Sequence, residues 1–492
     1  MCGIIGAYGI KDAILALVAG ANIQQQRGHD SSGGIVFFDD PSVEPVEVRK
    51  LGRVGDVFTE LRVNRMKGAR YGLVHCRYST AGSAFSKRNN QPFTADFHGP
   101  KGECEILTYI HNGNFTDPFF GRMMTTSDSE LISKGFETTN SQLPIEERIF
   151  QTLRLLHGAF SLLFLYRNGN GKISLIVARD PQGIRPLCYA KCGDGYIFAS
   201  ESVALTIIPG VKFEGFVQPG EIIVVDEDGL RSYRPLKWQN QRKAFCIFEL
   251  IYFMHPCSLV ETDNGHLVYI YQIRRALGAR LQQMAGAPTN LDVICSMPNS
   301  GNPHAEGAAV AFDVPFELDI TRNDGSGRTF IAPEGLILEA AEGKVDERTL
   351  KVLRKFGFYP NALANQVVGI VDDSIVRGLT MRVTMKLLRY YNGDLIKAIY
   401  VLVASAPIRY PCFWGINIAS RSELAIHQAQ GDVETLSSNL GVDSVTYLTV
   451  SAMVGTVSEC TGKCGQGYCT ACFTHEAPTS ILNPVYEREW AS

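Results

Sequence analysis

The sequence lacks several features that would assign it to a class directly. Its 47 basic and 50 acidic residues give a formal net charge of -3, with no long run of either sign. This balance offers no basic surface for nucleic acid or an anionic membrane, so small-molecule partners are favoured. The chain also lacks an apolar stretch of the roughly 18 residues that a membrane span requires, and residues 1–20 lack the pattern of a secretory signal. We therefore expect a cytoplasmic protein that binds neither nucleic acid nor membranes.

The sequence also has no internal repeat, so a solenoid is not expected. With 492 residues the chain exceeds the size of one ordinary core, and two large domains are expected. Short β-rich runs broken by glycine turns predict a first domain that is an α+β layered sandwich over residues 2–238. Alternating strand and helix patterns predict a second, α/β domain with a doubly wound parallel sheet over 239–450. The remaining residues, 451–492, are rich in cysteine and glycine, and we expect an irregular tail.

Hydrophobic periodicity predicts individual elements within both domains. In the first domain we expect helices at Ile10–Gln26, Asp128–Phe136 and Glu146–Leu156. The second domain is expected to alternate between helix Leu267–Ala285, strand Asp292–Met297, helix His304–Phe312, strand Gln366–Val371, helix Leu379–Tyr391 and strand Lys397–Val403.

The first three residues suggest a catalytic nucleophile. In Met1-Cys2-Gly3, removal of the initiator methionine would expose Cys2 as the first residue. Its α-amino group, with an ordinary pKa of about 7.7–8.0, would then lie beside the thiol and act as a base at neutral pH. One residue would thus supply both nucleophile and base. The alternative is a cysteine at position 2 without a catalytic role.

Four further segments supply groups that hydrolysis of an amino-acid amide needs. The turn QRGHDSSG brings Arg27 toward the N-terminus, and Arg77 in HCRYSTAG suits bidentate capture of an α-carboxylate. In HNGN, the Asn112 side chain and the Gly113 amide can form an oxyanion hole. In TSDSE, Asp128 can hold an α-ammonium group. The alternatives are a surface ion pair for Arg77 and a helix cap for Asp128.

In this order the segments resemble the class II, or N-terminal nucleophile, glutamine amidotransferase family. The resemblance implies an αββα sandwich of the Ntn-hydrolase type. It implies that Cys2 is the nucleophile and that Asn112 and Gly113 form the oxyanion hole. It further implies that Arg77 and Asp128 bind glutamine, and we include Arg27 among the glutamine-binding candidates.

The second half contains the segment QVVGIVDDSIVRGLT, an apolar strand that ends in two aspartates and turns into a helix. Amides of such a turn form a phosphate cradle, and the aspartates suit ribose hydroxyls and magnesium. The alternative is an acidic turn after a buried strand. The segment resembles the phosphoribosyl diphosphate loop of type I phosphoribosyltransferases. The residues expected to bind that substrate are Asp372, Asp373, Ser374, Ile375, Val376, Arg377, Gly378 and Thr380.

Two other segments belong to this expected site. The loop MPNSGN can hold a diphosphate by its amides, and Ser300 within it is expected to bind magnesium together with Asp372 and Asp373. Its alternative is an ordinary loop between strand and helix. The segment GRTFI, from Gly327 to Ile331, is expected to form a closing lid that excludes water and contacts the substrate through Arg328.

Over nearly its whole length the chain resembles the amidophosphoribosyltransferase family, also called glutamine phosphoribosylpyrophosphate amidotransferases. Further matching segments are ARDPQGIRPL, FASES and CIFE. The resemblance implies an enzyme that uses magnesium to make 5-phosphoribosylamine, glutamate and diphosphate, the first step of de novo purine synthesis. It also implies passage of ammonia through an internal channel, inhibition by purine nucleotides, and a dimeric or tetrameric homo-oligomer.

The chain departs from this family around the acceptor site. Between Arg322 and Phe330 it reads RNDGSGRTF where the family usually has KNRYVGRTF, so an arginine and a tyrosine are replaced. Leu379 stands in place of a threonine and Asn299 in place of an aspartate. Charge-assisted contacts of the kind lost contribute about 1.5–3 kcal/mol each. Two alternatives therefore stay open: a paralogue that aminates another activated sugar phosphate, and a regulatory homologue that binds nucleotides.

The thirteen cysteines are expected to stay reduced in the cytoplasm, which leaves nucleophile, metal ligand or packing residue as their roles. Sequence proximity favours a local zinc site formed by the tail residues Cys460, Cys464, Cys469 and Cys472. The iron-sulfur branch of the amidophosphoribosyltransferase family instead has its ligands in contexts that correspond here to Cys246, Cys412, Cys469 and Cys472. This resemblance implies a structural 4Fe-4S cluster that ties the tail to the second domain.

Overall fold

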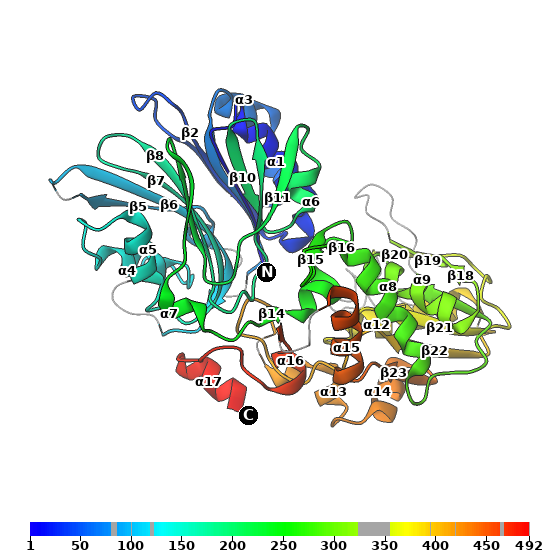
Figure 1. Cartoon of the computed structure of the whole chain (residues 1–492). Helices are drawn as coiled ribbons and strands as arrows, with labels where there is room; N and C mark the ends of the chain where they lie inside the picture. The colour runs from blue at the N-terminus through cyan, green and yellow to red at the C-terminus, as the bar shows by residue number, and fades with distance from the viewer. Residues whose placement is uncertain are drawn as a thin grey trace.

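The computed structural model describes residues 1–79, 86–99, 101–118, 123–322, 355–393, 395–418, 420–462 and 467–491. Within these residues the chain forms two lobes, and its C-terminal end lies below the first lobe (Figure 1). No helix among them has the length and apolar character that crossing a membrane requires. The expected lid, with Arg328, and the tail residue Cys464 lie outside the described residues.

The first lobe contains two antiparallel sheets. The seven-stranded sheet runs in the order β11 (Val211–Phe216), β9 (Cys188–Cys192), β10 (Gly195–Ala199), β1 (Gly3–Tyr8), β4 (Tyr71–Arg77), β2 (Ser31–Phe37) and β3 (Val46–Leu51). The six-stranded sheet runs in the order β13 (Gly229–Tyr233), β12 (Ile222–Asp226), β8 (Ile173–Arg179), β7 (Gly158–Arg167), β6 (Cys104–Phe115) and β5 (Phe93–His98).

Strand β7 shows why these sheets form inner layers. Alternate residues of a strand face opposite sides of its sheet. Leu163 and Leu165 join a core made by both sheets, whereas Phe160 and Phe164 join the core under helices α4 (Glu130–Glu137) and α5 (Ile145–Leu153).

Helix α1 (Ala13–Ile23) covers the outer face of the other sheet, where Ile14 and Leu17 are buried. The order of layers is therefore helix, sheet, sheet, helix. This arrangement confirms the expected αββα sandwich.

The second lobe is built on a five-stranded parallel sheet. Its order is β18 (Phe316–Glu317), β17 (Val293–Ser296), β21 (Val367–Asp372), β22 (Ala398–Val403) and β23 (Ser444–Tyr447). Helices α8 (Ile270–Arg280), α9 (Asn302–Phe312) and α15 (Val450–Thr461) pack in one core with this sheet, and α12 (Leu379–Tyr391) and α14 (Val433–Leu440) pack in another. Two separate cores on one parallel sheet confirm the doubly wound α/β class.

Two sequence expectations were wrong in detail. The helix expected at Leu267–Ala285 begins only at Ile270, because Leu267–Tyr269 forms strand β16 and pairs with β15 (Leu259–Glu261). Gly265 in the intervening turn has a positive φ of 76°, which suits glycine. The tail is also not irregular from residue 451, since α15 places Met453 and Val457 in the core.

After α15 the tail crosses the interface between the lobes. Strand β24 (Tyr468–Cys469) pairs in parallel with β14 (Phe245–Cys246), and the short helix α16 (Ala471–Thr474) follows. The chain ends in helix α17 (Pro484–Ala491), which lies below the first lobe in Figure 1. The C-terminal segment therefore contacts both halves of the molecule.

Candidate active sites and cysteine site

The first candidate site surrounds Cys2, which directly precedes β1. Strand β1 pairs with β4 so that Gly3 lies opposite Cys76, and this register brings Cys2 next to Arg77. The Cys2 amide donates to Asn112 Oδ1 at 3.0 Å, and its thiol lies 3.5 Å from the carbonyl oxygen of Tyr78. A small pocket opens here, lined by Cys2, Arg77, Tyr78, Gln91, His111, Gly113, Ser127, Asp128 and Ser129.

Asn112 and Gly113 have the arrangement that an oxyanion hole needs. Both lie near the end of β6, and Gly113 lines the pocket. The Asn112 Nδ2 atom is buried and, among the residues described, has no hydrogen-bond partner. A buried donor without a partner is costly unless a ligand or water binds it. Its position beside Cys2 suits an oxyanion that forms during attack by the thiol.

Asp128 is not a cap of the helix that follows it. Helix α4 begins at Glu130, and Asp128 Oδ2 instead accepts a hydrogen bond of 2.8 Å from the backbone amide of Phe115 on β6. Burial lowers the pKa of the neighbouring His111, so its imidazole is neutral near neutral pH. Asp128 is therefore the anionic side chain of this pocket, and it suits an ammonium group. Arg77 lines the same pocket and is 3% exposed, which argues against a surface ion pair.

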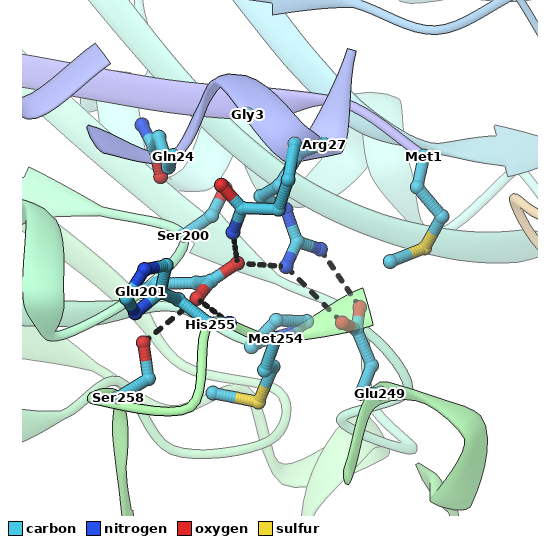
Figure 2. Close-up of polar contacts among 12 residues, drawn as sticks. Met1, Gly3, Gln24, Arg27, Ser200, Glu201, Glu249, Met254, His255 and Ser258 are labelled. Atoms are coloured by element: carbon cyan, nitrogen blue, oxygen red, sulfur yellow. Dashed lines mark hydrogen bonds and ion pairs between the residues drawn. The ribbon is translucent and has the colours of Figure 1, made fainter. Parts of the chain in front are cut away.

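Arg27 lies elsewhere than expected for a glutamine-binding residue. Its guanidinium is 0% exposed and bonds to Glu201 Oε1 at 2.6 Å and to Glu249 Oε1 at 2.8 Å (Figure 2). Its Nε atom donates to the carbonyl oxygen of Cys2 at 2.9 Å. Because these protein groups occupy the guanidinium, it is not available to capture an α-carboxylate. The expectation that Arg27 binds glutamine directly is therefore wrong, and its guanidinium instead makes a buried structural contact.

The two glutamates of this network were missed as site residues in the sequence. Glu201 follows β10, and its second oxygen accepts hydrogen bonds from the His255 amide and the Ser258 hydroxyl, each at 2.7 Å (Figure 2). Glu249 begins the short helix η3 (Glu249–Phe253) of the second half. The segments FASES and CIFE that contain them were noticed, but a local segment gives no indication of partners about two hundred residues away.

The second candidate site is a cavity of about 930 Å³ between the two lobes. Tyr78 from the first lobe and Tyr252 from η3 form part of its wall. Its floor is the segment between β21 and α12, and Ser300 contributes from the loop before α9. All of the residues expected in the phosphate cradle line this cavity, namely Asp372, Asp373, Ser374, Ile375, Val376, Arg377, Gly378 and Thr380.

The two aspartates have the electrostatics of a cation site. Burial and then the charge of Asp373 raise the pKa of the Asp372 carboxyl well above its usual value. Burial also raises the pKa of Asp373, although hydrogen bonds with Ser300 and Ser374 act in the opposite direction. Two adjacent buried carboxyls favour a bound cation, which offsets their repulsion. Oxygen ligands from two carboxylates and a hydroxyl suit magnesium.

The cradle itself is formed by backbone. Gly378 has a positive φ of 72° and directly precedes α12, so the amides of the first helical turn face the cavity without a preceding side-chain cap. Arg377 lines the cavity, but its Nε atom donates to Glu423 at 2.7 Å. Its guanidinium is therefore engaged by a protein carboxylate, and its backbone is the part that suits a phosphate.

The third candidate site is formed by four cysteines that lie far apart in the sequence. Cys246 is opposite Cys469 in the β14–β24 pair, and the Cys472 carbonyl accepts a hydrogen bond from the backbone near Cys412. Burial, and then the charges of Cys412, Cys246 and Cys469, raise the pKa of the Cys472 thiol well above its usual value. Cys460 has a raised pKa from burial and from Glu459, with no contribution from these four.

Over the described residues, no group of three or more histidine, cysteine, aspartate or glutamate side chains is arranged to hold a metal ion. The four cysteines that the resemblance implies are nevertheless close enough to affect each other's ionisation. The alternative set within the tail includes Cys464, which lies outside the described residues.

Comparisons with known proteins agree with these observations. A family model for a glutamine amidotransferase domain matches residues 119–207. The chain is 31% identical to the amidophosphoribosyltransferase of Methanothermobacter thermautotrophicus, over 99% of this chain and 96% of that protein. It is 29% identical to the amidophosphoribosyltransferase of Bacillus subtilis, over 98% and 94% of the two chains.

Solved structures give the same result. The glutamine phosphoribosylpyrophosphate amidotransferase of B. subtilis, complexed with ADP and GMP, superposes with a TM-score of 0.80 at 28% identity and covers 98% of each chain. A structure described as the allosteric regulatory enzyme of purine biosynthesis superposes with a TM-score of 0.83 at 28% identity, over 98% and 97% of the two chains. With relatives of this similarity over nearly its full length, the chain belongs to the amidophosphoribosyltransferase family.

Proposed function

We propose that this chain catalyses the glutamine-dependent amination of 5-phosphoribosyl diphosphate to 5-phosphoribosylamine, glutamate and diphosphate, the first step of de novo purine synthesis in the cytoplasm. The position of Tyr78 carries this proposal, because this residue lines both the Cys2 pocket and the Asp372–Asp373 cavity. Ammonia released beside Cys2 then has a short protected path to the acceptor.

The first half-reaction begins once Met1 has been removed. The Cys2 thiol transfers its proton to the Cys2 amine and attacks the amide carbon of glutamine. The developing oxyanion is stabilised by Asn112 Nδ2 and the Gly113 amide. The amine returns the proton to the leaving nitrogen, which departs as ammonia, and water then hydrolyses the thioester to glutamate. Arg77 and Asp128 hold the α-carboxylate and α-ammonium of glutamine throughout.

The second half-reaction takes place in the interlobe cavity. The amides at the start of α12 bind the 5-phosphate, and Asp372 and Asp373 bind the ribose hydroxyls. Ser300 and these aspartates would hold magnesium, which when bound would supply positive charge to offset that of the departing diphosphate. Ammonia attacks C1 of the ribose, the C–O bond to diphosphate breaks, and one proton leaves the new amine. Arg328 of the expected lid completes the proposed substrate contacts.

Cys246, Cys412, Cys469 and Cys472 would hold a 4Fe-4S cluster. The ionisation of these thiols depends on one another's charge, so they lie close enough to share one metal group. The family resemblance favours a cluster over a structural zinc ion at this place. Bound there, it would fasten the tail to the second lobe without taking part in either half-reaction. Brown, iron- and sulfide-containing protein after anaerobic purification supports the cluster, whereas colourless protein with zinc contradicts it.

Purine nucleotides are proposed as inhibitors. The B. subtilis relative was solved with ADP and GMP, and the cavity of this chain has the cradle that a nucleotide phosphate would share with the substrate. We further propose a homo-oligomer, either a dimer or a tetramer. Inhibition kinetics with ADP and GMP, and light scattering of the purified protein, test these two points.

The decisive experiment measures glutamate release from glutamine with magnesium, in the presence and absence of phosphoribosyl diphosphate. Strong stimulation supports the proposed acceptor. Equal rates would indicate a different activated sugar phosphate, and release that persists in Cys2→Ala would contradict the proposed nucleophile. Cys2→Ala should retain amination of phosphoribosyl diphosphate by free ammonia, because the acceptor cavity is intact in that variant.

A further inference from the structure

The end of strand β6 is contacted by residues that lie outside the first lobe. This strand carries Asn112 and Gly113, and its next residues Asn114, Phe115 and Thr116 continue toward the tail. Asn114 Nδ2 donates to the carbonyl oxygen of Phe413 at 2.8 Å, a contact between residues 299 positions apart. Residues 411–418, which include Cys412, therefore contact the strand directly behind the expected oxyanion hole.

Gly415 brings this loop close to the oxyanion strand itself. Its φ of +116° favours glycine, and a β-carbon placed on it would lie 3.5 Å from the backbone of Gly113. The loop is closed by a 2.9 Å hydrogen bond from the Cys412 amide to the Ile418 carbonyl. Trp414, in the same loop, is fully buried. The contact with β6 is thus made by a packed loop and not by an exposed one.

The C-terminal segment holds the same strand one step further along. Thr116 accepts hydrogen bonds at its carbonyl from the amides of Leu482 at 2.9 Å and Asn483 at 2.6 Å. Its hydroxyl donates to the Ser480 carbonyl at 2.8 Å. Thr116 is 0% exposed, so these hydrogen bonds are sheltered from water.

The loop and the C-terminal segment also support each other. The ring of Tyr486 on α17 stacks on Phe413 with centroids 4.7 Å apart and planes 11° from parallel. Trp490 on the same helix packs edge-on against Trp414 at 5.2 Å. Burial, and then the charge of Asp128, raise the pKa of the Tyr486 hydroxyl, which indicates that α17 reaches the neighbourhood of the glutamine pocket.

We propose that residues 411–418 and 480–491 form a brace that positions the oxyanion strand, with Asn114 and Tyr486 as positioning residues for the glutamine half-reaction. The brace acts on Asn112 and Gly113 through Asn114, and on Asp128 through the Phe115 amide. This inference rests on the proposed function of the Cys2 pocket. It assigns to the second half and the tail a role in glutamine hydrolysis in addition to acceptor chemistry.

Two substitutions test the brace. Asn114→Leu keeps the side-chain size and removes the donor to Phe413, and Tyr486→Ala removes the stacked ring. A misplacement of about 1 Å in a catalytic group can lower the rate by about 100-fold. We therefore expect kcat for glutamate release to fall about 10- to 100-fold, with the KM for glutamine changed much less. Amination by free ammonia should stay within about twofold of wild type.

Val485→Ala is the matched control, because Val485 lies on the same helix with 54% of its surface exposed. Tyr486→Phe separates the two contacts of this side chain, since it keeps the stacked ring and removes the hydroxyl that interacts with the Asn114 side chain. Its kcat should lie between those of wild type and Tyr486→Ala. Hydrogen exchange of the Gly113–Thr116 amides gives a readout that does not depend on activity, and it should be fastest in Tyr486→Ala and unchanged in Val485→Ala.

The outcomes separate the brace from the proposed function. Unchanged glutamate release and unchanged exchange in Asn114→Leu and Tyr486→Ala would overturn the brace, as would an equal loss of ammonia-dependent activity. If wild-type glutamate release does not depend on Cys2, the proposed function fails, whereas faster exchange at Gly113–Thr116 would still support the brace as a structural contact.

Discussion

Arg27 donates a hydrogen bond from Nε to the carbonyl oxygen of Cys2 at 2.9 Å, while the same guanidinium is paired with Glu249 of the second lobe. One buried side chain thus joins the residue proposed as nucleophile to the helix η3 that lines the acceptor cavity. The pair lies wholly out of water, with both side chains 0% exposed. Glu249 also pairs with the buried Arg185 at 3.3 Å. Removing its carboxylate breaks both pairs and leaves an uncompensated positive charge in the interior, although Arg27 keeps its bond to Glu201.

Glu249→Gln should therefore destabilise the protein by about 3–5 kcal/mol, the usual result of breaking a buried ion pair. Chemical denaturation followed by fluorescence measures this change. Arg231→Gln is the control, because the Arg231–Asp226 pair is at the surface and exposed pairs contribute about 0–1 kcal/mol. Equal effects of the two substitutions would contradict a special role for the buried pair.

The pH below which glutamine hydrolysis slows should be unusually low. In the chain that retains Met1, burial lowers the pKa of the terminal amine to about 5, and the cations of Arg185 and Arg27 act in the same direction. After Met1 is removed, the Cys2 amine stays at a residue that is 6% exposed and near the Arg27 guanidinium, and both burial and this positive charge disfavour its protonated form. A lowered pKa means that the amine is a neutral base at lower pH.

We therefore expect kcat/KM for glutamine to rise with pH through an apparent pKa clearly below the ordinary value of about 7.7–8.0, and to be level above it. A stopped assay of glutamate release between pH 5 and about 9 measures this profile. An acidic limb centred at or above 8 would show that the amine is solvated.

Sequence patterns predicted the fold because most of it follows from local periodicity. The alternation of apolar side chains in β7 and the apolar strand before Asp372 each indicate which faces of the strand are buried. The same patterns put the expected site residues at strand ends, where parallel strands and turns expose backbone groups. Helix Leu379–Tyr391 was predicted with its observed limits.

The features that could not be predicted depend on distant partners. Nothing in QRGHDSSG distinguishes an arginine that binds a substrate carboxylate from Arg27, whose carboxylates come from Glu201 and Glu249. The brace on β6 involves Asn114 and Phe413, which no local pattern connects. The proposed set of Cys246, Cys412, Cys469 and Cys472 comes only from resemblance, because spacing alone favours a site within the tail.

Neutralising Asp372 should stabilise the metal-free protein while removing acceptor activity. The pKa of Asp372 is higher in the folded state than the usual value, so the folded state binds more protons and loses stability as pH rises above about 4. Asp372→Asn removes this cost at neutral pH, and its midpoint of thermal unfolding should rise. A change of 1 kcal/mol corresponds to about 2–4 °C in a domain of this size.

The same variant should lose the stabilisation that magnesium and phosphoribosyl diphosphate give the wild type. Asp194→Asn, in an exposed turn, is the control and should change neither property. A lower midpoint in metal-free Asp372→Asn would mean that the carboxylate is satisfied by the protein rather than held for a cation.

Serine substitutions of two cysteines distinguish the two proposed cysteine sets. Cys412→Ser and Cys460→Ser each remove one thiol, but only Cys412 lies among Cys246, Cys469 and Cys472. Because a bound metal group contributes its binding free energy to folding, Cys412→Ser should lose iron, visible absorption and thermal stability together. Cys460→Ser should retain all three, as measured by metal analysis, spectroscopy and calorimetry on anaerobic protein. If Cys460→Ser instead loses zinc while Cys412→Ser retains it, the local tail site is correct, and the β14–β24 pairing that brings Cys246 to Cys469 would be incidental to metal binding.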